Sequence, residues 1–138
     1  MKITETSDLA ACHALRRTVF VEEQSVPEAE EMDDLDGQAI HLLACDGDRP
    51  VGTARVLIRG DIGKIGRVCV LPDQRGTGLG AALIRAALDL LRRQGVTQAR
   101  LGSQTHALGF YEKLGFVAEG PIYDDAGIPH RDMSLNLA

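Results

Sequence analysis

The sequence predicts an α/β or α+β fold with a mixed sheet, formed by one domain that spans residues 1–138. Two observations support this prediction. Short apolar runs separated by turn residues occupy the first half of the chain, and one long amphipathic helix pattern follows them. In addition, 138 residues with 44% hydrophobic positions are enough for one core and leave no room for a second domain.

The N-terminal part is predicted to hold a helix followed by an acidic stretch. Thr6 or Ser7 is a candidate helix cap, with Asp8 as an acid in the first turn. Apolar residues then recur at roughly helical spacing up to Phe20. Residues 22–37, called the acidic segment below, contain eight Asp or Glu residues without clear periodicity. We expect a solvated loop or a short broken helix there.

Three strands and one long helix are predicted in the middle of the chain. Residues 39–45 and 51–58 are apolar runs on either side of a turn-forming stretch, which favours a hairpin. Residues 64–71 suggest another strand, which Pro72 ends. From Leu79 onward, apolar residues recur at i, i+4, i+7 and i+11, the spacing of one helix face.

The C-terminal part is predicted to alternate short strands with one short helix. Residues 108–114 favour the helix, which Gly115 ends. The strand candidates are residues 99–102, 116–119 and 133–137, and residues 125–130 are expected to form a late loop.

The charge balance excludes several classes of partner. The formal net charge is −5 and the sequence pI is about 5.3, whereas nucleic acids and anionic membranes attract basic surfaces. We therefore expect neither as the main partner. No stretch approaches the roughly 18 apolar residues of a membrane helix, and the N-terminus lacks the apolar run of a signal peptide. A soluble, cytoplasmic protein is the expectation.

The cysteines and acids show no metal-site pattern. Cys12, Cys45 and Cys69 are far apart, without the spacing of a disulfide framework or a zinc site. Cys12 and Cys45 are expected to be small core residues. The acids between residues 30 and 36 lack the alternating ligand spacing of a calcium loop. We expect no bound metal.

A glycine-rich loop, residues 74–80, is the strongest functional motif. It leads from a strand into the long helix, and the first N–H groups of a helix are unpaired donors at the positive end of its dipole. Gly76, Gly78 and Gly80 remove side chains that would keep a phosphate away. The spacing is neither the GxGxxG of dinucleotide folds nor a P-loop. A plain tight connection is the simpler alternative.

This loop and a second motif together resemble the GCN5-related N-acetyltransferase (GNAT) family. The first motif is Arg75-x-x-Gly78-x-Gly80 after Val68-Cys69-Val70-Leu71-Pro72, and the second is Gly109-Phe110-Tyr111-Glu112-Lys113-Leu114-Gly115-Phe116. The run from Val19 to Pro27, together with the acids up to Asp36, His41 and residues 125–130, is similar to the small YjcF-like or ElaA-like branch. The resemblance implies a mostly antiparallel central sheet flanked by helices.

The resemblance also implies an acyltransferase that uses acetyl-CoA as co-substrate. The strand at residues 68–70 would pair through its backbone with the pantetheine arm, and an N–H near Val70 would stabilise the developing oxyanion. Tyr111 stands where the family's general acid usually stands, with packing against the preceding strand as the simpler alternative. Gln104 replaces an asparagine that often binds pantetheine. The implied cofactor-binding residues are Val68, Cys69, Val70, Arg75, Gly76, Thr77, Gly78, Leu79, Gly80, Ala81 and Gln104.

The resemblance places the acceptor between the first helix with its acidic segment and residues 125–130. Acids there would suit a polyamine, an amino sugar or a basic side chain, and a primary amine would attack the thioester directly. Cys69 on the cofactor strand has no partner that would lower its thiol pKa. The general base stays unassigned, and the candidates are Glu23, Glu30, Glu31, Asp33, Asp36, His41, His106 and His130, with His41 and His130 as tentative substrate residues. The favoured alternative for His41 is a structural histidine bonded to the backbone, and the alternative for His106 is a cap of the short helix.

Two alternatives remain open at this point. The chain could be a CoA-binding or acyl-CoA-binding module that has lost its catalytic groups, or an unrelated nucleotide-binding α/β protein. A homodimer is also possible, and the sequence does not indicate which surface would form it.

Overall fold

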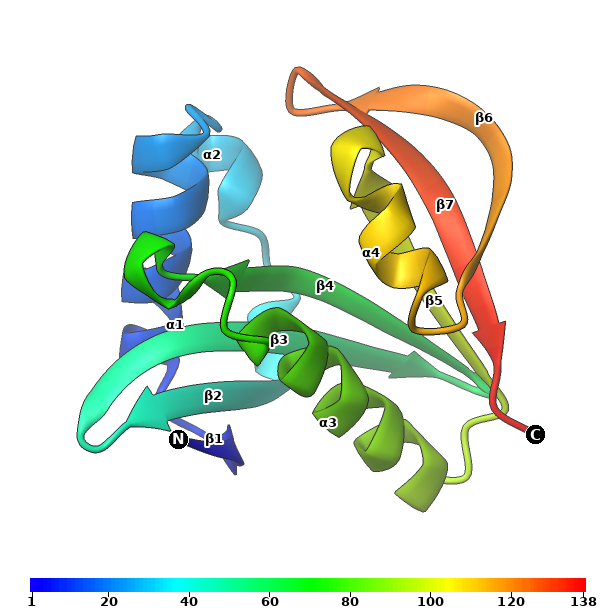
Figure 1. Ribbon diagram of the computed structural model, residues 1–138, viewed down its shortest axis with the longest axis horizontal. Coiled ribbons are helices and arrows are strands. Elements are labelled where there is room, and N and C mark those ends of the chain that lie inside the picture. Colours follow the sequence, from blue (N-terminus) through cyan, green and yellow to red (C-terminus); the bar gives the residue numbers. More distant parts are fainter.

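Seven strands form one sheet in the computed structural model, which describes all 138 residues (Figure 1). The strand order is β1-β2-β3-β4-β5-β7-β6. Neighbouring strands pair antiparallel except β4 and β5, which are parallel, so the mixed, mostly antiparallel sheet is confirmed. The strands are β1 (Lys2–Thr6), β2 (Ile40–Asp46), β3 (Arg49–Arg59), β4 (Ile62–Val70), β5 (Gln98–Gln104), β6 (Val117–Asp125) and β7 (Ile128–Asn136).

Helices cover both faces of this sheet (Figure 1). On one face lie α3 (Leu79–Arg93) and α4 (Leu108–Glu112), and on the other lies α1 (Leu9–Arg16), which continues as the π-helix η1 (Arg17–Glu23). Shorter turns are α2 (Glu28–Glu31) and the 3-10 helices η2 (Asp36–Gln38), η3 (Pro72–Gln74) and η4 (Thr105–Ala107). None of these helices is both long and apolar enough to cross a membrane.

Most of the apolar core lies on the α3 face. A cluster of 18 buried residues there includes Leu83, Ile84 and Leu91 of α3, which follow the apolar stripe that the sequence shows. The α1 face has a smaller cluster of five buried residues, among them Cys12 and Leu15. Cys12 is fully buried and Cys45 partly buried, as expected of small residues that pack in a core.

The sheet opens between β4 and β5. These strands pair only where Ile62–Lys64 faces Gln98–Arg100, and they diverge beyond that point (Figure 1). The far half of β4 therefore has β3 on one side and no strand on the other. A bulge lies in this free half, because Arg67 and Val68 together face one residue of β3 between the pairs Arg55↔Gly66 and Thr53↔Cys69.

Several boundaries differ from the sequence-based expectation. Asp8, rather than Thr6 or Ser7, caps α1, because its carboxylate accepts a hydrogen bond from the Ala11 N–H at 3.1 Å. Strand β1 was not predicted. Residues 125–130 form the tip of a long β6–β7 hairpin instead of a loop, because Gly127 adopts a left-handed φ of 80° at its turn.

Candidate active site

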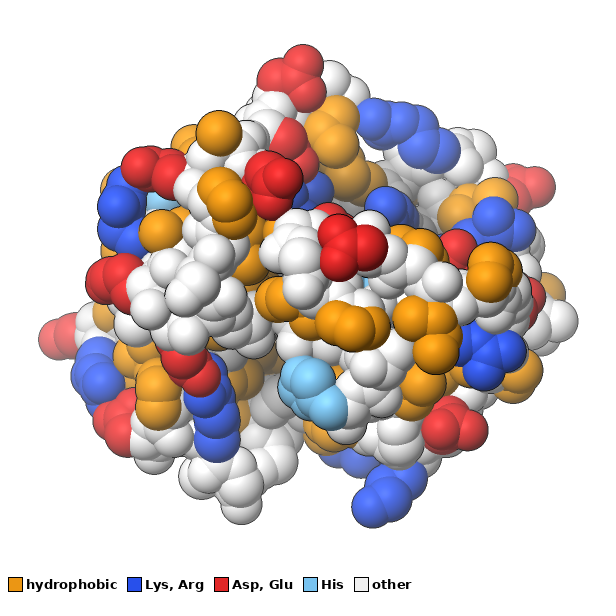
Figure 2. All heavy atoms as spheres, turned by 90° about the horizontal axis from the view of Figure 1, so that it is seen from above, with side chains coloured by type: hydrophobic (Ala, Val, Ile, Leu, Met, Phe, Trp, Pro, Cys, Tyr) orange, Lys and Arg blue, Asp and Glu red, His pale blue; other side chains and the backbone are white.

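A cleft of about 590 Å³ lies where β4 and β5 diverge. The π-helix η1 and the acidic segment line one side of it, and β5, α4 and the β6–β7 hairpin line the other. Figure 2 looks down onto this opening and shows the hollow between the two halves of the molecule. Residues that are far apart in the sequence, such as Gln24 and His130, therefore share one cavity.

The free edge of β4 presents backbone groups to the cleft. The N–H of Leu71 donates to the carbonyl of Val51 at 2.9 Å, on the β3 side. Consecutive residues of a strand point their backbone groups to opposite edges, so those of Val70 point to the cleft side. The carbonyl of Val70 accepts a hydrogen bond from Nε of Arg75 at 3.2 Å, in agreement with this orientation.

The glycine loop leaves a row of donors free at the start of α3. Gly76 and Gly78 adopt left-handed φ angles of 77° and 86°, which a residue with a side chain rarely takes. The N–H groups of residues 76–81 donate no hydrogen bond to another atom of the protein. They stand at the N-terminus of a helix of 15 residues, where the helix dipole favours negative charge.

The Arg75 side chain fastens this loop to the opposite side of the cleft. Its Nη1 and Nη2 atoms contact both carboxylate oxygens of Glu23 at 2.5 and 2.7 Å. Its backbone N–H donates to Pro72 at 3.3 Å. Because these donors are engaged, Arg75 positions the loop, and the free donors begin at Gly76. Thr77 is engaged similarly, through its hydroxyl to the Gln74 carbonyl, and Leu79 is buried in the core.

Tyr111 lines the cleft from α4. Its ring meets Phe116 edge to face with centroids 5.9 Å apart, and the hydroxyl makes no hydrogen bond within the protein. Burial raises the pKa of Tyr111 to about 12. The phenol is therefore protonated at neutral pH and able to donate its proton.

Three side chains form a hydrogen-bonded chain across the inner part of the cleft. Nε2 of Gln104 donates to Oε1 of Gln24 at 3.0 Å, and Oε1 of Gln104 lies 2.7 Å from Nε2 of His106. Gln24 ends η1, whereas Gln104 ends β5. The chain therefore links the two sides of the cleft and holds the Gln104 amide in one orientation.

The two tentative substrate histidines take different places. His41 does not line the cleft: its side chain is buried on β2 and Nε2 lies 2.9 Å from the backbone oxygen of Asp36. We therefore correct its tentative assignment as a substrate residue to a structural one. His130 lies in β7 and does line the cleft. Its Nδ1 donates to the Ile128 carbonyl at 2.7 Å, which leaves Nε2 as an acceptor when the ring is neutral.

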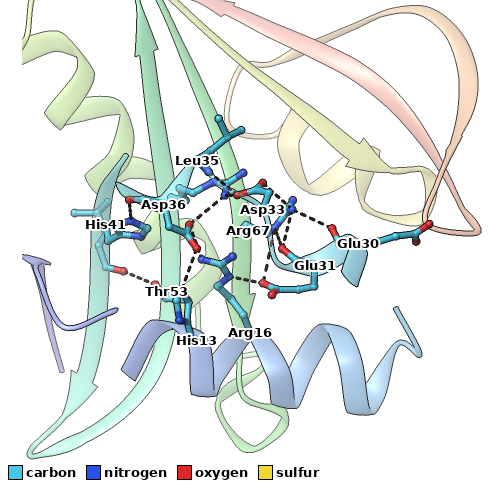
Figure 3. Close-up of polar contacts among 12 residues, drawn as sticks. His13, Arg16, Glu30, Glu31, Asp33, Leu35, Asp36, His41, Thr53 and Arg67 are labelled. Atoms are coloured by element: carbon cyan, nitrogen blue, oxygen red, sulfur yellow. Dashed lines mark hydrogen bonds and ion pairs between the residues drawn. The ribbon is translucent and has the colours of Figure 1, made fainter. Parts of the chain in front are cut away.

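Glu31, Asp33 and Asp36 of the acidic segment pack against the sheet (Figure 3), whereas its other five acids stay exposed as expected. Arg16 of α1 contacts Glu31 at 2.5 Å and Asp36 at 2.9 Å. Arg55 of β3 contacts Asp36 at 3.1 Å and Asp33 at 2.8 Å. Arg16, Glu31, Asp36 and Arg55 are all buried. This set of ion pairs, called the buried ion network below, replaces the expected solvent contacts of these three acids.

The network also removes most acids as candidate bases. Burial opposes ionisation of Asp36, but hydrogen bonds from Arg16, His13 and Arg55 outweigh it and hold its pKa well below its usual range. The pKa of Asp33 is lowered in the same way, with Arg55 as the main donor. The hydrogen bond from Arg75 lowers the pKa of Glu23. Among the acids considered, Glu30 lines the cleft without a side-chain partner.

Cys69 is unsuited to act as a nucleophile. It lies on β4 beside the cleft, and burial raises its thiol pKa to about 12. The reactive thiolate is therefore scarce at neutral pH, which disfavours a covalent intermediate on this residue.

Sequence reasoning missed several residues of the cleft. Lys64 and Arg67 of β4 and Tyr123 of β6 line it, but nothing in their local pattern indicates a site. Arg67 has a φ of 50° at the bulge, a conformation that no sequence pattern announces. Gln24 lies within the run from Val19 to Pro27, but nothing in that run indicates its contact with Gln104, which connects positions 80 residues apart.

Comparisons with known proteins agree with this geometry. Residues 4–137 match the family model described as the acetyltransferase (GNAT) domain. The chain is 38% identical over 120 residues to the uncharacterized N-acetyltransferase YjcF of Bacillus subtilis, covering 86% of each chain. It is 35% identical over 136 residues to protein ElaA of Escherichia coli, covering 95% of this chain and 89% of ElaA.

Solved structures give the same result. An acyl-CoA N-acyltransferase from Pseudomonas aeruginosa superposes with a TM-score of 0.87 at 33% identity, covering 97% of this chain and 99% of that one. An aminoglycoside 6'-N-acetyltransferase solved with coenzyme A superposes with a TM-score of 0.78 at 20% identity, covering 100% and 98%, and it shows the fold alone. The chain belongs to the GNAT acetyltransferase family.

Proposed function

We propose that this protein is an acetyl-CoA-dependent N-acetyltransferase that passes the acetyl group directly to a primary amine of a small molecule or peptide. The observation that carries the proposal is that the free edge of β4 at Val70 and the protonated phenol of Tyr111 line one cleft, together with Arg75. The unpaired N–H groups of the glycine loop follow directly after Arg75.

The residues present fit acetyl-CoA. A pyrophosphate needs several N–H donors and no intruding side chain, and residues 76–81 offer both. A Cβ atom built at Gly76 or Gly78 meets nothing within 4 Å, so the loop leaves open space on that side. The pantetheine arm carries amides, which would pair with the free edge of β4 as an added strand does. The related aminoglycoside acetyltransferase, which shares the fold, was solved with coenzyme A.

Acetyl-CoA, when bound, supplies the acetyl thioester, and the chain's own groups supply binding and proton transfer. The Val70 N–H would donate to the thioester oxygen as negative charge grows there. Tyr111 would give its proton to the sulfur that leaves as CoA. Gln104, fixed by Gln24 and His106, would orient the arm. The other proposed cofactor-binding residues act through their backbone groups or by supporting the loop. They are Val68, Cys69, Arg75, Thr77, Leu79, Gly80 and Ala81.

The amine must lose a proton before it attacks, because a typical alkylammonium pKa lies near 10.4. His130 is the group we propose for this step, directly or through water. Its Nδ1 proton is held by Ile128 and its Nε2 lone pair is free, and it stacks on Tyr123 with ring centroids 6.0 Å apart. Glu30 is the second candidate on the same cleft.

The test is release of the CoA thiol from acetyl-CoA across a broad panel of amines, with the acetylated product identified by mass spectrometry. We expect turnover in the wild type and loss of most of it in Tyr111→Phe, with unchanged acetyl-CoA binding. Binding of acetyl-CoA without turnover of any amine would instead favour the alternative, a non-catalytic CoA-binding module.

A further inference from the structure

Three of the acids near the cleft are not available to a cationic acceptor. Glu31, Asp33 and Asp36 are held by Arg16 and Arg55 in the buried ion network. Pulling one of these carboxylates away would leave a buried arginine unpaired, which costs several kcal/mol. These three acids therefore give no support to a preference for a polyamine or another polycation, and Glu30 and Asp125 are the acids that line the cleft without an ion pair.

Basic side chains occupy the floor of the cleft instead. Ile65 and Val70 pack into the core beneath α3, so Lys64 and Arg67 project from the other face of β4. Both line the cleft. Lys64 is exposed and forms no ion pair, and its register neighbour Arg100 on β5 contacts only the amide of Gln98. Figure 2 shows acidic side chains around the opening and basic ones within the hollow.

Arg67 is held so that part of its guanidinium stays free. Nε and Nη2 donate to the backbone oxygen of Glu31 at 3.3 and 3.0 Å, and Nη2 also contacts Asp33 at 3.2 Å. Nη1 makes no hydrogen bond within the protein, and the side chain is 26% exposed. Figure 3 shows Arg67 between Asp33 and Glu31, and the Glu30 carboxylate pointing away from the network. A fixed guanidinium with a free N–H edge suits a carboxylate.

The floor beside Arg67 has room for such a group. Gly66 precedes Arg67 on β4, and a Cβ atom built at Gly66 meets no atom within 4 Å. Burial and the charge of Arg55 lower the pKa of Arg67, so a negative charge beside this group would relieve an unfavourable environment.

We infer that the acceptor is a primary amine that carries a carboxylate several bonds away, and that Arg67 and Lys64 bind this carboxylate. The inference rests on the proposed function and names its acceptor class. Val70 lies three positions after Arg67 on β4, which is roughly 10 Å at about 3.3 Å per residue. An amine on a flexible arm spans this distance better than an α-amine does. A free amino acid and the C-terminal residue of a peptide both offer this chemistry.

The experiment compares acids with their amides as acceptors. The probes are ε-aminocaproate and its amide, glycine and glycinamide, and glycyl-lysine with a free or amidated C-terminus. We expect kcat/KM for ε-aminocaproate to exceed that for its amide by about tenfold or more, because a charge-assisted pair is lost in the amide. The peptide probes distinguish a free amino acid from a peptide C-terminus as the acceptor. A higher kcat/KM for glycyl-lysine with a free C-terminus than for ε-aminocaproate favours the peptide C-terminus.

Variants assign the preference to the floor of the cleft. The acid-to-amide ratio should fall toward one in Lys64→Met and in Arg67→Met, and Arg67→Lys should retain part of it. Lys2→Met is the matched control, because Lys2 is an exposed lysine on β1, outside the cleft. Lys64 has no partner in the fold, so its variant tests the inference even if Arg67→Met is unstable.

A binding measurement separates this inference from the proposed function. N-acetyl-ε-aminocaproate and its amide are titrated into the CoA-bound protein by calorimetry, with circular dichroism as the folding check. Tighter binding of the acid that depends on Lys64 supports the inference, whether or not an amine is turned over. Equal rates and equal binding for acid and amide would overturn it while leaving acetyl transfer intact. Failure to bind CoA or acetyl-CoA overturns the proposed function.

Discussion

The two faces of the sheet are packed by different physics. The α3 face buries 18 apolar residues in one cluster, whereas the α1 face combines five buried residues with a network of charged side chains. Apolar burial stabilises the fold in proportion to area. A buried ion pair gains little net stability, because the attraction is offset by desolvation. The α3 face therefore holds the domain together, and the α1 face sets where the acidic segment lies.

This difference explains the shape of the cleft. The acidic segment carries Glu30 and the backbone oxygens that hold Arg67. No apolar residue of the segment belongs to either buried cluster. Apart from the buried Val26, its position next to the cleft therefore depends on charged contacts, above all those of Arg16 and Arg55, which we regard as positioning residues for the acceptor side. We therefore expect substitutions on the two faces of the sheet to differ in their effects on stability and on the cleft.

The largest expected effect is that of Arg16→Met. The substitution keeps an apolar side chain but leaves the buried carboxylates of Glu31 and Asp36 without this partner. The free energy of unfolding should fall by about 3 to 5 kcal/mol, measured by urea denaturation. A loss of stability below about 1 kcal/mol would show that the acidic segment is free to move. It would contradict the proposed difference between the two faces of the sheet.

Leu83→Ala should cost about 3 kcal/mol, because it leaves a cavity in the α3 core, where Leu83 is 0% exposed. Acetyl-CoA affinity of the folded protein should change little. The double variant Leu83→Ala with Arg16→Met tests whether the two faces of the sheet contribute to stability independently. Since the two side chains pack on opposite faces, their effects should add within about 0.5 kcal/mol. Strong coupling would mean that the faces are not independent.

Tyr111→Phe should lower kcat by about 100-fold and leave the stability and the KM for acetyl-CoA nearly unchanged. Because the pKa of Tyr111 is about 12, the wild-type phenol stays protonated through the neutral range, and its titration should not limit kcat below about pH 10. An unchanged kcat would remove Tyr111 from the mechanism.

The α1 face should also be the acid-sensitive one. The pKa of Asp36 is lower in the folded state than in the unfolded chain, so the unfolded state binds more protons at low pH. The stability that Asp36 contributes is present above about pH 4 and is lost as pH falls further. Denaturant midpoints measured from pH 6 to 3 should decline, and Asp36→Asn should reduce the slope.

The smallest effect is expected for Glu23→Gln, which breaks the ion pair with Arg75. Both side chains are more than one third exposed, at 38% and 43%, so the stability should fall by less than about 1 kcal/mol. Acetyl-CoA affinity is the more informative measurement, because the pair fastens the glycine loop to η1. Equal affinity in both proteins would show that the loop needs no such support.

The sequence predicts the α3 face better than the α1 face, for a physical reason. The stripe from Leu79 to Leu90 and the glycine loop are local patterns, and local patterns determine local structure. The buried ion network joins Arg16, Glu31 and Arg55, which periodicity cannot relate, so the acids were expected to be solvated. The backbone partner of His41, Asp36, matches the structural alternative for this histidine, whereas the tentative substrate role does not fit its buried position. The bulge at Arg67 leaves no sequence signal.

The central claim, that the glycine loop binds the pyrophosphate of acetyl-CoA, is tested most directly by isothermal titration of three proteins. Gly78→Glu adds a negative side chain, and Gly78→Ala is the matched control, because both share the strain of a φ of 86°. We expect tight binding by the wild type, similar binding by Gly78→Ala, and at least about 100-fold weaker binding by folded Gly78→Glu. No binding by the wild type, or equal affinity of all three proteins, would contradict the account.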